Sequence, residues 1–242
     1  MRRVFREPRR ILAGSVALLI PAAALASVPQ QVVPVASELG TPTFTAPVSS
    51  SSETTGSTAS TSYDGAWGTS DAYQSMLNQS YGADAVAAAQ AAGINPDTLA
   101  AFGQIESHFQ NVGNSTSSAN GVWQITNGTW DQYASKLGLS SADRSAPAAQ
   151  AKVASAIISD YSAAVSRATG TAATGTQVYG AYMFGTKAGA EIATEKNAST
   201  PLSAFVSSST LAANHMSGWT VGQYQQTVAQ RMGSGASEAV TG

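Results

Sequence analysis

The sequence predicts an all-α domain, with at most a minor β-hairpin, that follows a leader and a tether. Three observations predict this class. Apolar residues recur at helical spacing through most of residues 71–232. Helix-start and helix-stop signals bound these segments. No stretch alternates polar and apolar residues cleanly enough to predict a strand. We therefore expect six to nine helices, with any hairpin confined to the Gly- and Ser-rich loop after residue 110.

Residues 1–26 have the organisation of a secretory signal peptide. Five arginines precede a mostly apolar run from Ile11 to Leu25, and Ala24-Leu25-Ala26 is a small-x-small cleavage pattern. An uncleaved membrane anchor is the alternative, because the apolar run approaches the length of a short span. We expect cleavage near Ala26, no stable membrane insertion afterwards, and export to the periplasm, the cell wall or the extracellular space.

Residues 27–70 are predicted to be a disordered linker. Four prolines, at positions 29, 34, 42 and 47, precede the run SSSSETTGSTASTS, which has too little apolar content to offset the entropy of ordering. The alternative is an irregular arm that packs on the domain through Tyr63 and Trp67. Residues 233–242, GSGASEAVTG, are predicted to be a disordered tail, which leaves residues 71–232 for the folded domain.

Composition excludes several classes of function. Without residues 1–26, seven basic and thirteen acidic side chains remain, so the net charge is about −6. Nucleic acid and anionic lipid require clustered Lys and Arg and are not expected partners. The chain has no cysteine, and its two histidines, His108 and His215, lack ligand spacing. We therefore expect neither a metal site nor a cofactor.

The clearest helix begins at Asn95-Pro96-Asp97, which combines an N-cap residue, a proline at the first helical position and an acid in the first turn. Leu99, Phe102, Ile105 and Phe109 follow at helical spacing, and the helix should end near Ser107. Other helices are predicted at 71–92, at 127–137, from Pro147 to Gly170, at 174–195, from Thr200-Pro201, and after Thr220. Gly180, Gly185 and Gly189 weaken the prediction for 174–195.

Glu106 lies alone at the end of this helix. It follows Phe102 by four residues and Leu99 by seven, so it projects from the edge of the apolar stripe. Apolar neighbours and the negative end of the helix dipole both disfavour the carboxylate, which raises the pKa toward the range of a general acid near neutral pH. The alternative is a solvated surface glutamate, which is what most Glu residues near helix ends are.

A series of motifs surrounds this acid. Glu106-Ser107 is followed by Ser115, by Ser118-Ala119-Asn120-Gly121-Val122-Trp123-Gln124, by Thr129, and by Ala181-Tyr182-Met183-Phe184-Gly185. In order and spacing these resemble the E-S, loop Ser, G-A-x-G-L-M-Q, Thr-containing helix start and A-Y-N-A-G motifs of the soluble lytic murein transglycosylases, and more distantly those of goose-type lysozymes. The resemblance covers about residues 70–190, with its core at 102–130.

Three positions depart from the family pattern. Ser118 replaces a usual Gly, which puts the backbone conformation of the loop in doubt, because Ser does not readily adopt positive φ. Trp123 replaces a usual Met, and Met183-Phe184 replaces the usual Asn-Ala. These changes put the pose of the substrate in doubt.

The resemblance implies a lysozyme-like fold that acts on the glycan strands of bacterial peptidoglycan, with Glu106 as the sole catalytic acid and base. The enzyme would cleave the β-1,4 bond between N-acetylmuramic acid and N-acetylglucosamine without water and leave a 1,6-anhydro end. Ser115, Gln124 and Tyr182 would bind substrate or orient the acid. Each also has a structural alternative: a turn cap for Ser115, a loop brace for Gln124 and a core ring for Tyr182.

Four aromatic residues are candidates to stack on sugars, and we expect core packing for at least two of them: Trp123, Trp130, Tyr133 and Trp219. His108 is two residues from Glu106 and should point elsewhere, at the surface. Two competing functions stay open. One is a goose-type hydrolase that uses Asp131 or Asp143 to activate water, and the other is an inactive cell-wall-binding module. Envelope-spanning secretion machinery is a further partner that an exported wall enzyme would suit.

Overall fold

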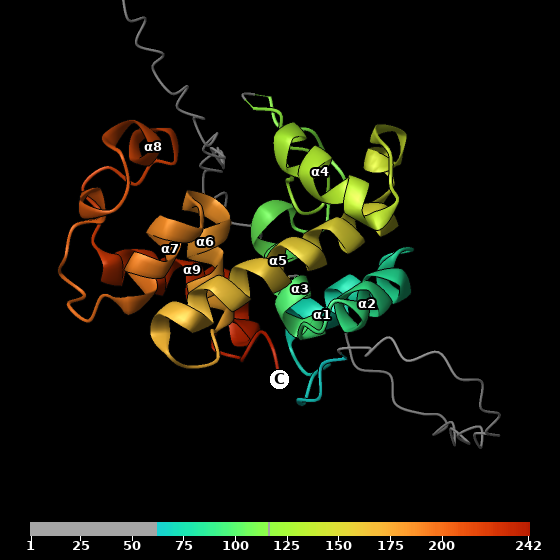
Figure 1. Cartoon of the computed structure of the whole chain (residues 1–242), viewed down its shortest axis with the longest axis horizontal. Coiled ribbons are helices and arrows are strands. Elements are labelled where there is room, and N and C mark those ends of the chain that lie inside the picture. Colours follow the sequence, from blue (N-terminus) through green and yellow to red (C-terminus); the bar gives the residue numbers. More distant parts are fainter. Residues whose placement is uncertain (1–61, 116) are drawn as a thin grey trace, which may run out of the picture. The chain divides into compact units, whose positions relative to one another are not determined.

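The computed structural model describes residues 62–115 and 117–242. Within these ranges the regular secondary structure consists of nine α-helices and four short 3-10 helices (Figure 1). The prediction of an all-α domain is therefore confirmed. The hairpin expected in the Gly- and Ser-rich loop is reduced to single antiparallel bridges, Gly113 with Asn120 and Asn120 with Ile125. The predicted signal peptide and most of the predicted linker lie outside the described residues.

The helices follow the predicted order along the chain. The α-helices are α1 (Asp71–Leu77), α2 (Gly82–Ala91), α3 (Pro96–Ser107), α4 (Asn127–Ala134), α5 (Pro147–Thr169), α6 (Gly175–Phe184), α7 (Thr186–Thr194), α8 (Ser208–Ala213) and α9 (Val221–Met232). The 3-10 helices are Ser135–Leu137, Ser141–Ser145, Leu202–Ala204 and Gly233–Ala236. None of the helices in the described ranges is long and apolar enough to cross a bilayer.

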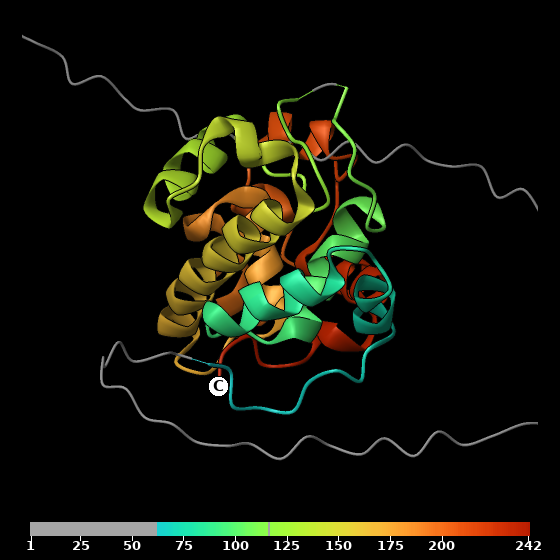
Figure 2. The ribbon, with the colours of Figure 1, turned by 90° about the vertical axis from the view of Figure 1, so that its right-hand side faces the viewer.

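The long helix α5 organises the packing. It contacts α2 on one side and α6 and α7 on the other, and it can be followed between these groups in both views (Figures 1 and 2). Helix α3 packs against α1, α2 and α9. The start and end of α5 are those that the sequence predicts, since Pro147 opens the helix and Gly170 ends it at a φ of 75°.

Helix α3 is anchored at its start by both ends of the domain. Asn95 caps the helix by accepting a hydrogen bond from the Asp97 N–H (2.9 Å), as predicted. The buried Asp97 carboxylate accepts hydrogen bonds from the Gly68 N–H (2.6 Å) and the Ser70 hydroxyl (2.6 Å). The Asn95 N–H donates to the Val240 carbonyl (2.8 Å). These bonds fix the helix that carries Glu106.

The prediction of disorder is therefore wrong for part of the linker and for the C-terminal segment. Residues 62–70, assigned to the linker, form an arm that Asp97 binds, which was the stated alternative. Residues 233–242, assigned to a tail, form a 3-10 helix and then a packed segment in which Val240 is fully buried. Small residues at 233–236 carry little hydrophobic signal of their own. They fit here because Gly235 lies close to the Asp97 carbonyl, where a Cβ would be only 3.1 Å from the oxygen.

The glycines that weakened the prediction for residues 174–195 allow two helices to lie close together. A Cβ on Gly189 in α7 would lie 2.2 Å from the Ala181 nitrogen in α6, so only glycine fits there. Gly185 separates the helices at a φ of 87°. The helix expected after Pro201 is only the 3-10 turn Leu202–Ala204.

Candidate active site

The end of α3 places Glu106 beside the loop of residues 108–126. The helix ends at Ser107, as predicted, and the next two residues, His108 and Phe109, have positive φ values of 52° and 64°. This turn buries the Phe109 ring and leaves His108 at the surface, where its Nδ1 lies 2.7 Å from Nε2 of Gln104. The predicted surface position of His108 is confirmed. Glu106 itself stays partly exposed, between the core and the solvent.

The Glu106 carboxyl is held in its protonated form. Burial raises its pKa from 4.5 to about 8, and the nearby Tyr179 hydroxyl offsets part of that rise. At pH 7 the acid therefore outnumbers its carboxylate by roughly ten to one. No described Asp or Glu contributes to this pKa. The pKa thus matches the task of a general acid, for the apolar-environment reason that the sequence predicted.

Three tyrosine side chains surround the carboxyl. Tyr179 and Tyr182 lie one turn apart on α6, and Tyr224 comes from α9. Burial raises the pKa of each hydroxyl, and Glu106 is the second cause in every case. The Tyr179 and Tyr224 hydroxyls are buried and make no hydrogen bond of normal geometry with any described residue. The Tyr179 hydroxyl interacts with the Glu106 carboxyl and lowers its pKa, the Tyr224 hydroxyl is an unused donor, and the Tyr182 hydroxyl bonds to the loop.

Aromatic packing fixes these rings. The Phe102 ring, one turn before Glu106 on α3, meets Tyr179 and Tyr182 edge-on, with ring centroids 5.2 and 5.1 Å apart. The two tyrosine rings stack on each other at 6.2 Å. The Tyr182 hydroxyl donates a hydrogen bond to the Trp123 carbonyl (2.6 Å), which ties α6 to the loop. Tyr182 lies near enough to Glu106 for the carboxyl to raise the pKa of its hydroxyl, and that hydroxyl is bonded to the loop.

Gln124 is brought into the same region but acts mainly as a loop brace. Its backbone has a φ of 45°, unusual for a residue with a side chain. Its Nε2 donates to the carbonyls of Val112 (2.9 Å) and Gly121 (2.8 Å), so both amide hydrogens are used. The side-chain oxygen has no partner among the described residues and stays available as an acceptor. The structure thus favours the bracing alternative for the amide nitrogen.

Ser107, the second residue of the E-S motif, also holds the loop. Its hydroxyl donates to the Val122 carbonyl (2.7 Å). Ser115 behaves differently: it is exposed in the loop and makes no hydrogen bond to Glu106 or to any other described residue. The structure therefore does not bring Ser115 to the acid. Ser118 is exposed with an ordinary negative φ, and its hydroxyl accepts from the Asn127 N–H (3.2 Å). The positive φ that a glycine serves occurs instead at Gly121 (85°).

Two side chains from other elements hold this loop in place by hydrogen bonds, and neither was predicted from the sequence. The buried Gln150 on α5 accepts from the Val122 N–H (2.9 Å) and donates to Asn111 (2.9 Å) and to the Arg144 carbonyl (2.8 Å). Arg144 donates to the Ser118 and Ile125 carbonyls, both at 2.6 Å, and to the Asn127 side chain. Nothing near Gln150 in the sequence indicates the loop, which lies about thirty residues earlier.

The aromatic candidates separate clearly. Trp123 and Trp130 are almost fully buried, and their indole N–H groups donate to the carbonyls of Leu99 (2.9 Å) and Ser140 (3.3 Å). Tyr133 is also buried. The expectation of core packing for at least two of the four is confirmed, and Trp219 is the candidate that remains partly exposed.

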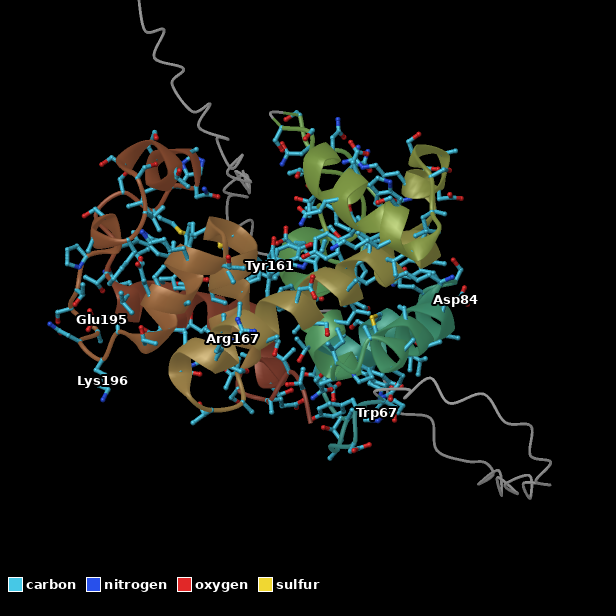
Figure 3. All side chains as sticks on the ribbon, viewed as in Figure 1. Trp67, Asp84, Tyr161, Arg167, Glu195 and Lys196 are labelled. Carbon is cyan, nitrogen blue, oxygen red and sulfur yellow. The ribbon has the colours of Figure 1, made fainter. Side chains whose placement is uncertain are left out.

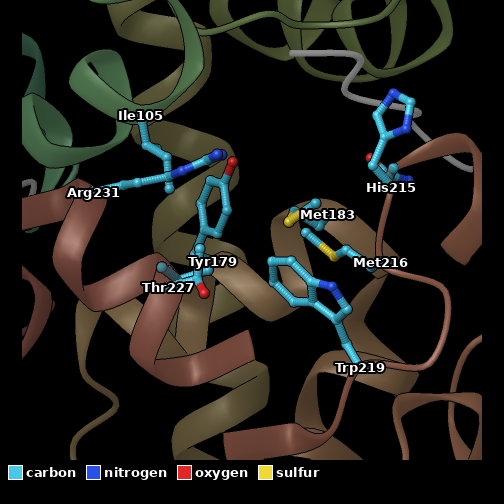
Figure 4. A pocket seen from close by; sticks show the side chains of 10 residues that line it. Ile105, Tyr179, Met183, His215, Met216, Trp219, Thr227 and Arg231 are labelled. Carbon is cyan, nitrogen blue, oxygen red and sulfur yellow. The ribbon is translucent and has the colours of Figure 1, made fainter. Parts of the chain in front are cut away.

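Two pockets include tyrosines that adjoin Glu106. One is lined by Gln124, Ile125, Thr126, Thr129, Tyr161 and Tyr182. Tyr161, labelled in Figure 3, comes from α5. Thr129, which matches the Thr of the motif series, thus lies in the same pocket as Gln124 and Tyr182. The second pocket contains Tyr179 and Trp219 and is shown in Figure 4.

Neither alternative acid contributes to the pKa of Glu106. Asp131 is exposed on α4. The Asp143 carboxylate accepts from the N–H and the hydroxyl of Ser140, both at 2.7 Å, and the backbone N–H is the main reason that its pKa is lowered. Among the described residues, no three His, Asp or Glu side chains gather as a metal site would require.

Of the neighbours of Glu106, Tyr179 and the role of Tyr224 were not predicted from the sequence. A signal existed for Tyr179, because it precedes Tyr182 by three residues and so lies on the same face of one helix. Tyr224 had no such signal, since α9 lies beyond the motif series. The fold and the site together define an all-α domain built around one protonated carboxyl, which is the arrangement of an acid–base enzyme.

Comparison with known proteins identifies a family domain within the chain. Residues 85–201 match the family described as Transglycosylase SLT domain. A search of curated proteins finds no match. A solved structure of an inactive mutant of the lytic transglycosylase Slt from Pseudomonas aeruginosa matches with 16% identity and a TM-score of 0.43, covering 69% of this chain and 26% of that one. The chain spans about a quarter of that relative. Residues 85–201 thus carry a transglycosylase SLT domain, as the motifs predicted.

Proposed function

We propose that the protein is a peptidoglycan lytic transglycosylase, an enzyme that cleaves the β-1,4 bond between N-acetylmuramic acid and N-acetylglucosamine without consuming water. The observation that carries the proposal is Glu106, with a pKa of about 8 and no second carboxylate among the groups that influence it. A glycosidase that hydrolyses ordinarily uses two carboxyl groups, about 5 to 9.5 Å apart. One carboxyl suffices when a hydroxyl of the sugar itself is the nucleophile, in place of water or a second carboxylate.

The reaction would take two steps. The Glu106 acid protonates the glycosidic oxygen, the bond from that oxygen to C1 of the muramic acid breaks, and the N-acetylglucosamine leaves as an alcohol. The Glu106 carboxylate then removes the proton from the C6 hydroxyl of the muramic acid, whose oxygen bonds to C1. The product is a 1,6-anhydro ring, and the proton on Glu106 is restored, so atoms and charges balance.

The hydroxyls around the acid suit both steps. The Tyr179 hydroxyl, which lowers the pKa of Glu106, and the buried Tyr224 hydroxyl would donate to the carboxylate that forms after the first step. We assign substrate contact to the Gln124 side-chain oxygen and to the pocket that Gln124 shares with Tyr182 and Thr129. Ser115, exposed in the loop, would contact the glycan only as the strand enters.

The substrate implies an envelope location. We propose that residues 1–26 direct export and that the mature domain acts in the periplasm or at the cell wall, with peptidoglycan glycan strands as its partner. Envelope-spanning secretion machinery is a proposed recruiting partner.

The test is digestion of purified sacculi by residues 27–242, followed by mass analysis. We expect 1,6-anhydromuropeptides from the wild type and none from Glu106→Gln. Reducing ends alone would indicate a hydrolase. Binding to sacculi without turnover, unchanged by Glu106→Gln, would indicate an inactive wall-binding module.

A further inference from the structure

Residues 121–124 form a tight turn within the loop beside Glu106. Both ends of this turn have positive φ values, 85° at Gly121 and 45° at Gln124. Gln124 carries a side chain, and such a residue keeps a left-handed backbone only where the surrounding contacts enforce it. The turn therefore needs anchors from other parts of the fold.

Side chains from three helices bind the backbone in the middle of this turn, at Val122 and Trp123. The Ser107 hydroxyl on α3 donates to the Val122 carbonyl (2.7 Å), and the Tyr182 hydroxyl on α6 donates to the Trp123 carbonyl (2.6 Å). The Gln150 side-chain oxygen on α5 accepts from the Val122 N–H (2.9 Å). Val122 is thus tied through its carbonyl to the helix that carries the acid, and through its N–H to α5.

Gln150 is the anchor that lies outside the motif series. It is buried, and its amide nitrogen donates to the Asn111 side chain (2.9 Å) and to the Arg144 carbonyl (2.8 Å), so the oxygen and both amide hydrogens have partners. A Cβ on Gly121 would lie 2.3 Å from the Gln150 amide, which means that the amide packs directly on the backbone of the turn. A buried amide fixed at three points determines where the Val122 N–H lies.

The position of this turn determines what lies opposite the acid. Gln124, two residues after Val122, lines a pocket together with Thr129 and Tyr182. Glu106 is held by α3, whereas the distance from Glu106 to this pocket depends on the anchors of the turn. A shift of about 1 Å in catalytic geometry can cost roughly a hundredfold in rate. An anchor of the turn therefore acts on the reaction without touching the reacting atoms.

We propose that Gln150 is a positioning residue for the reaction: by holding the Val122 N–H, it sets the distance between Glu106 and the turn that faces the sugar. This rests on the proposed function, because Glu106 is the reacting group in that function. Gln150 is not among the groups that influence the pKa of Glu106, so its effect passes through the backbone of Val122 and not through the acid.

Three substitutions on α5 separate this role from a general loss of packing. Gln150→Met keeps the approximate size of the side chain and removes its acceptor and both donors. Gln150→Glu, assayed at pH 5 where a buried glutamate is protonated, keeps an acceptor for the Val122 N–H and one donor. Ser155→Ala is the matched control, because Ser155 is also buried on α5 and its hydroxyl has no partner among the described residues. All assays are run well below the melting temperature of each variant.

We expect Gln150→Met to lower kcat on glycan strands by roughly tenfold or more, with a smaller change in KM. Gln150→Glu should recover part of this loss at pH 5, and Ser155→Ala should change neither constant. The alkaline limb of the pH profile should stay at about pH 8 in Gln150→Met, because the acid keeps its surroundings. An unchanged kcat would overturn the proposal. So would a limb that moves to lower pH, since it would mean that the whole site loosens and exposes Glu106.

Hydrogen exchange distinguishes failure of this proposal from failure of the proposed function. We expect the Val122 amide to exchange at least tenfold faster in Gln150→Met than in the wild type, while the amide of Ile157, farther along α5, keeps its rate. An unchanged rate at Val122 would overturn the proposal even if the enzyme is active. Faster exchange at Val122 together with no cleavage of any strand by the wild type would contradict the proposed function and would support the anchoring of the turn by Gln150.

Discussion

The Tyr182 hydroxyl donates a 2.6 Å hydrogen bond to the Trp123 carbonyl, and this bond joins helix α6 to the loop that borders Glu106. The Trp123 indole is anchored in turn to the Leu99 carbonyl on α3 (2.9 Å). The acid, the loop and the tyrosine pair on α6 are thus held to one another by the core of the domain. These hydrogen bonds give a loop of small polar residues a fixed position beside Glu106.

Substituting Tyr182→Phe should loosen this wall while keeping the ring. The Trp123 carbonyl loses its donor, which costs about 1–3 kcal/mol in the free energy of unfolding when the group stays buried. We expect kcat to fall by roughly tenfold as the loop shifts. Denaturant unfolding and strand digestion measure the two effects. Tyr73→Phe, a buried tyrosine beside Trp67 at the other end of the domain, is the control, and an equal loss of kcat there would contradict this role.

Activity should fall as the pH rises through about 8. The first step needs the protonated form of Glu106, whose pKa is about 8, so kcat/KM should decrease tenfold per pH unit on the alkaline side. Because the Tyr179 hydroxyl lowers that pKa, Tyr179→Phe should move the alkaline limb to higher pH even where the rate itself drops. Initial rates of the wild type and of Tyr179→Phe from pH 5 to 10 locate the alkaline limb of each protein. A limb that stays in place, or moves to lower pH, would argue against the contact between Tyr179 and Glu106.

The same shift makes stability depend on pH. Between pH about 4.5 and about 8 the folded protein retains a proton on Glu106 that the unfolded chain has lost. Raising the pH across this window therefore lowers the free energy of unfolding, by up to ~1.4 kcal/mol per unit. Glu106→Gln removes this dependence and should be the more stable protein at pH 9. Urea titrations of both proteins from pH 4 to 9 measure the difference, and parallel curves would mean that folding does not raise the pKa of Glu106.

Gly121 should not tolerate substitution, because of its positive φ and because of the lack of space around it. Gly138 shares only the positive φ, so comparing the two positions separates these causes. Its φ of 85° strains any side chain, and a Cβ there would lie 2.3 Å from the Gln150 amide that clamps the loop. Gly138 has a similar φ of 67° but open space around it. We expect Gly138→Ala to cost about 1 kcal/mol and to leave activity intact, and Gly121→Ala to cost more and to abolish activity. Equal losses of unfolding free energy in the two variants, measured by thermal unfolding, would show that the Gln150 side chain moves aside without cost.

The features that could be predicted from the sequence are those set by residues within a single helix. The cap at Asn95-Pro96 and the stripe of Leu99, Phe102 and Ile105 define α3 and place Glu106 at its end, because both signals act within one helix. Tyr224, Gln150 and Arg144 reach the site from distant helices and turns, so only the packing of the chain reveals them. The segment at 233–242 was misassigned for a related reason: its small residues carry no hydrophobic pattern, yet they fit a narrow space against α3.

The central claim is that the muramic C6 hydroxyl attacks C1 in place of water, with Glu106 as the carboxyl that donates and then accepts the proton. Digestion of peptide-bearing strands in water enriched in heavy oxygen, with mass analysis of the new muramic ends, tests it most directly. The proposed mechanism predicts 1,6-anhydro ends that carry no heavy oxygen and that are absent with Glu106→Gln. Reducing ends that contain heavy oxygen would contradict it and would assign the cleavage to hydrolysis.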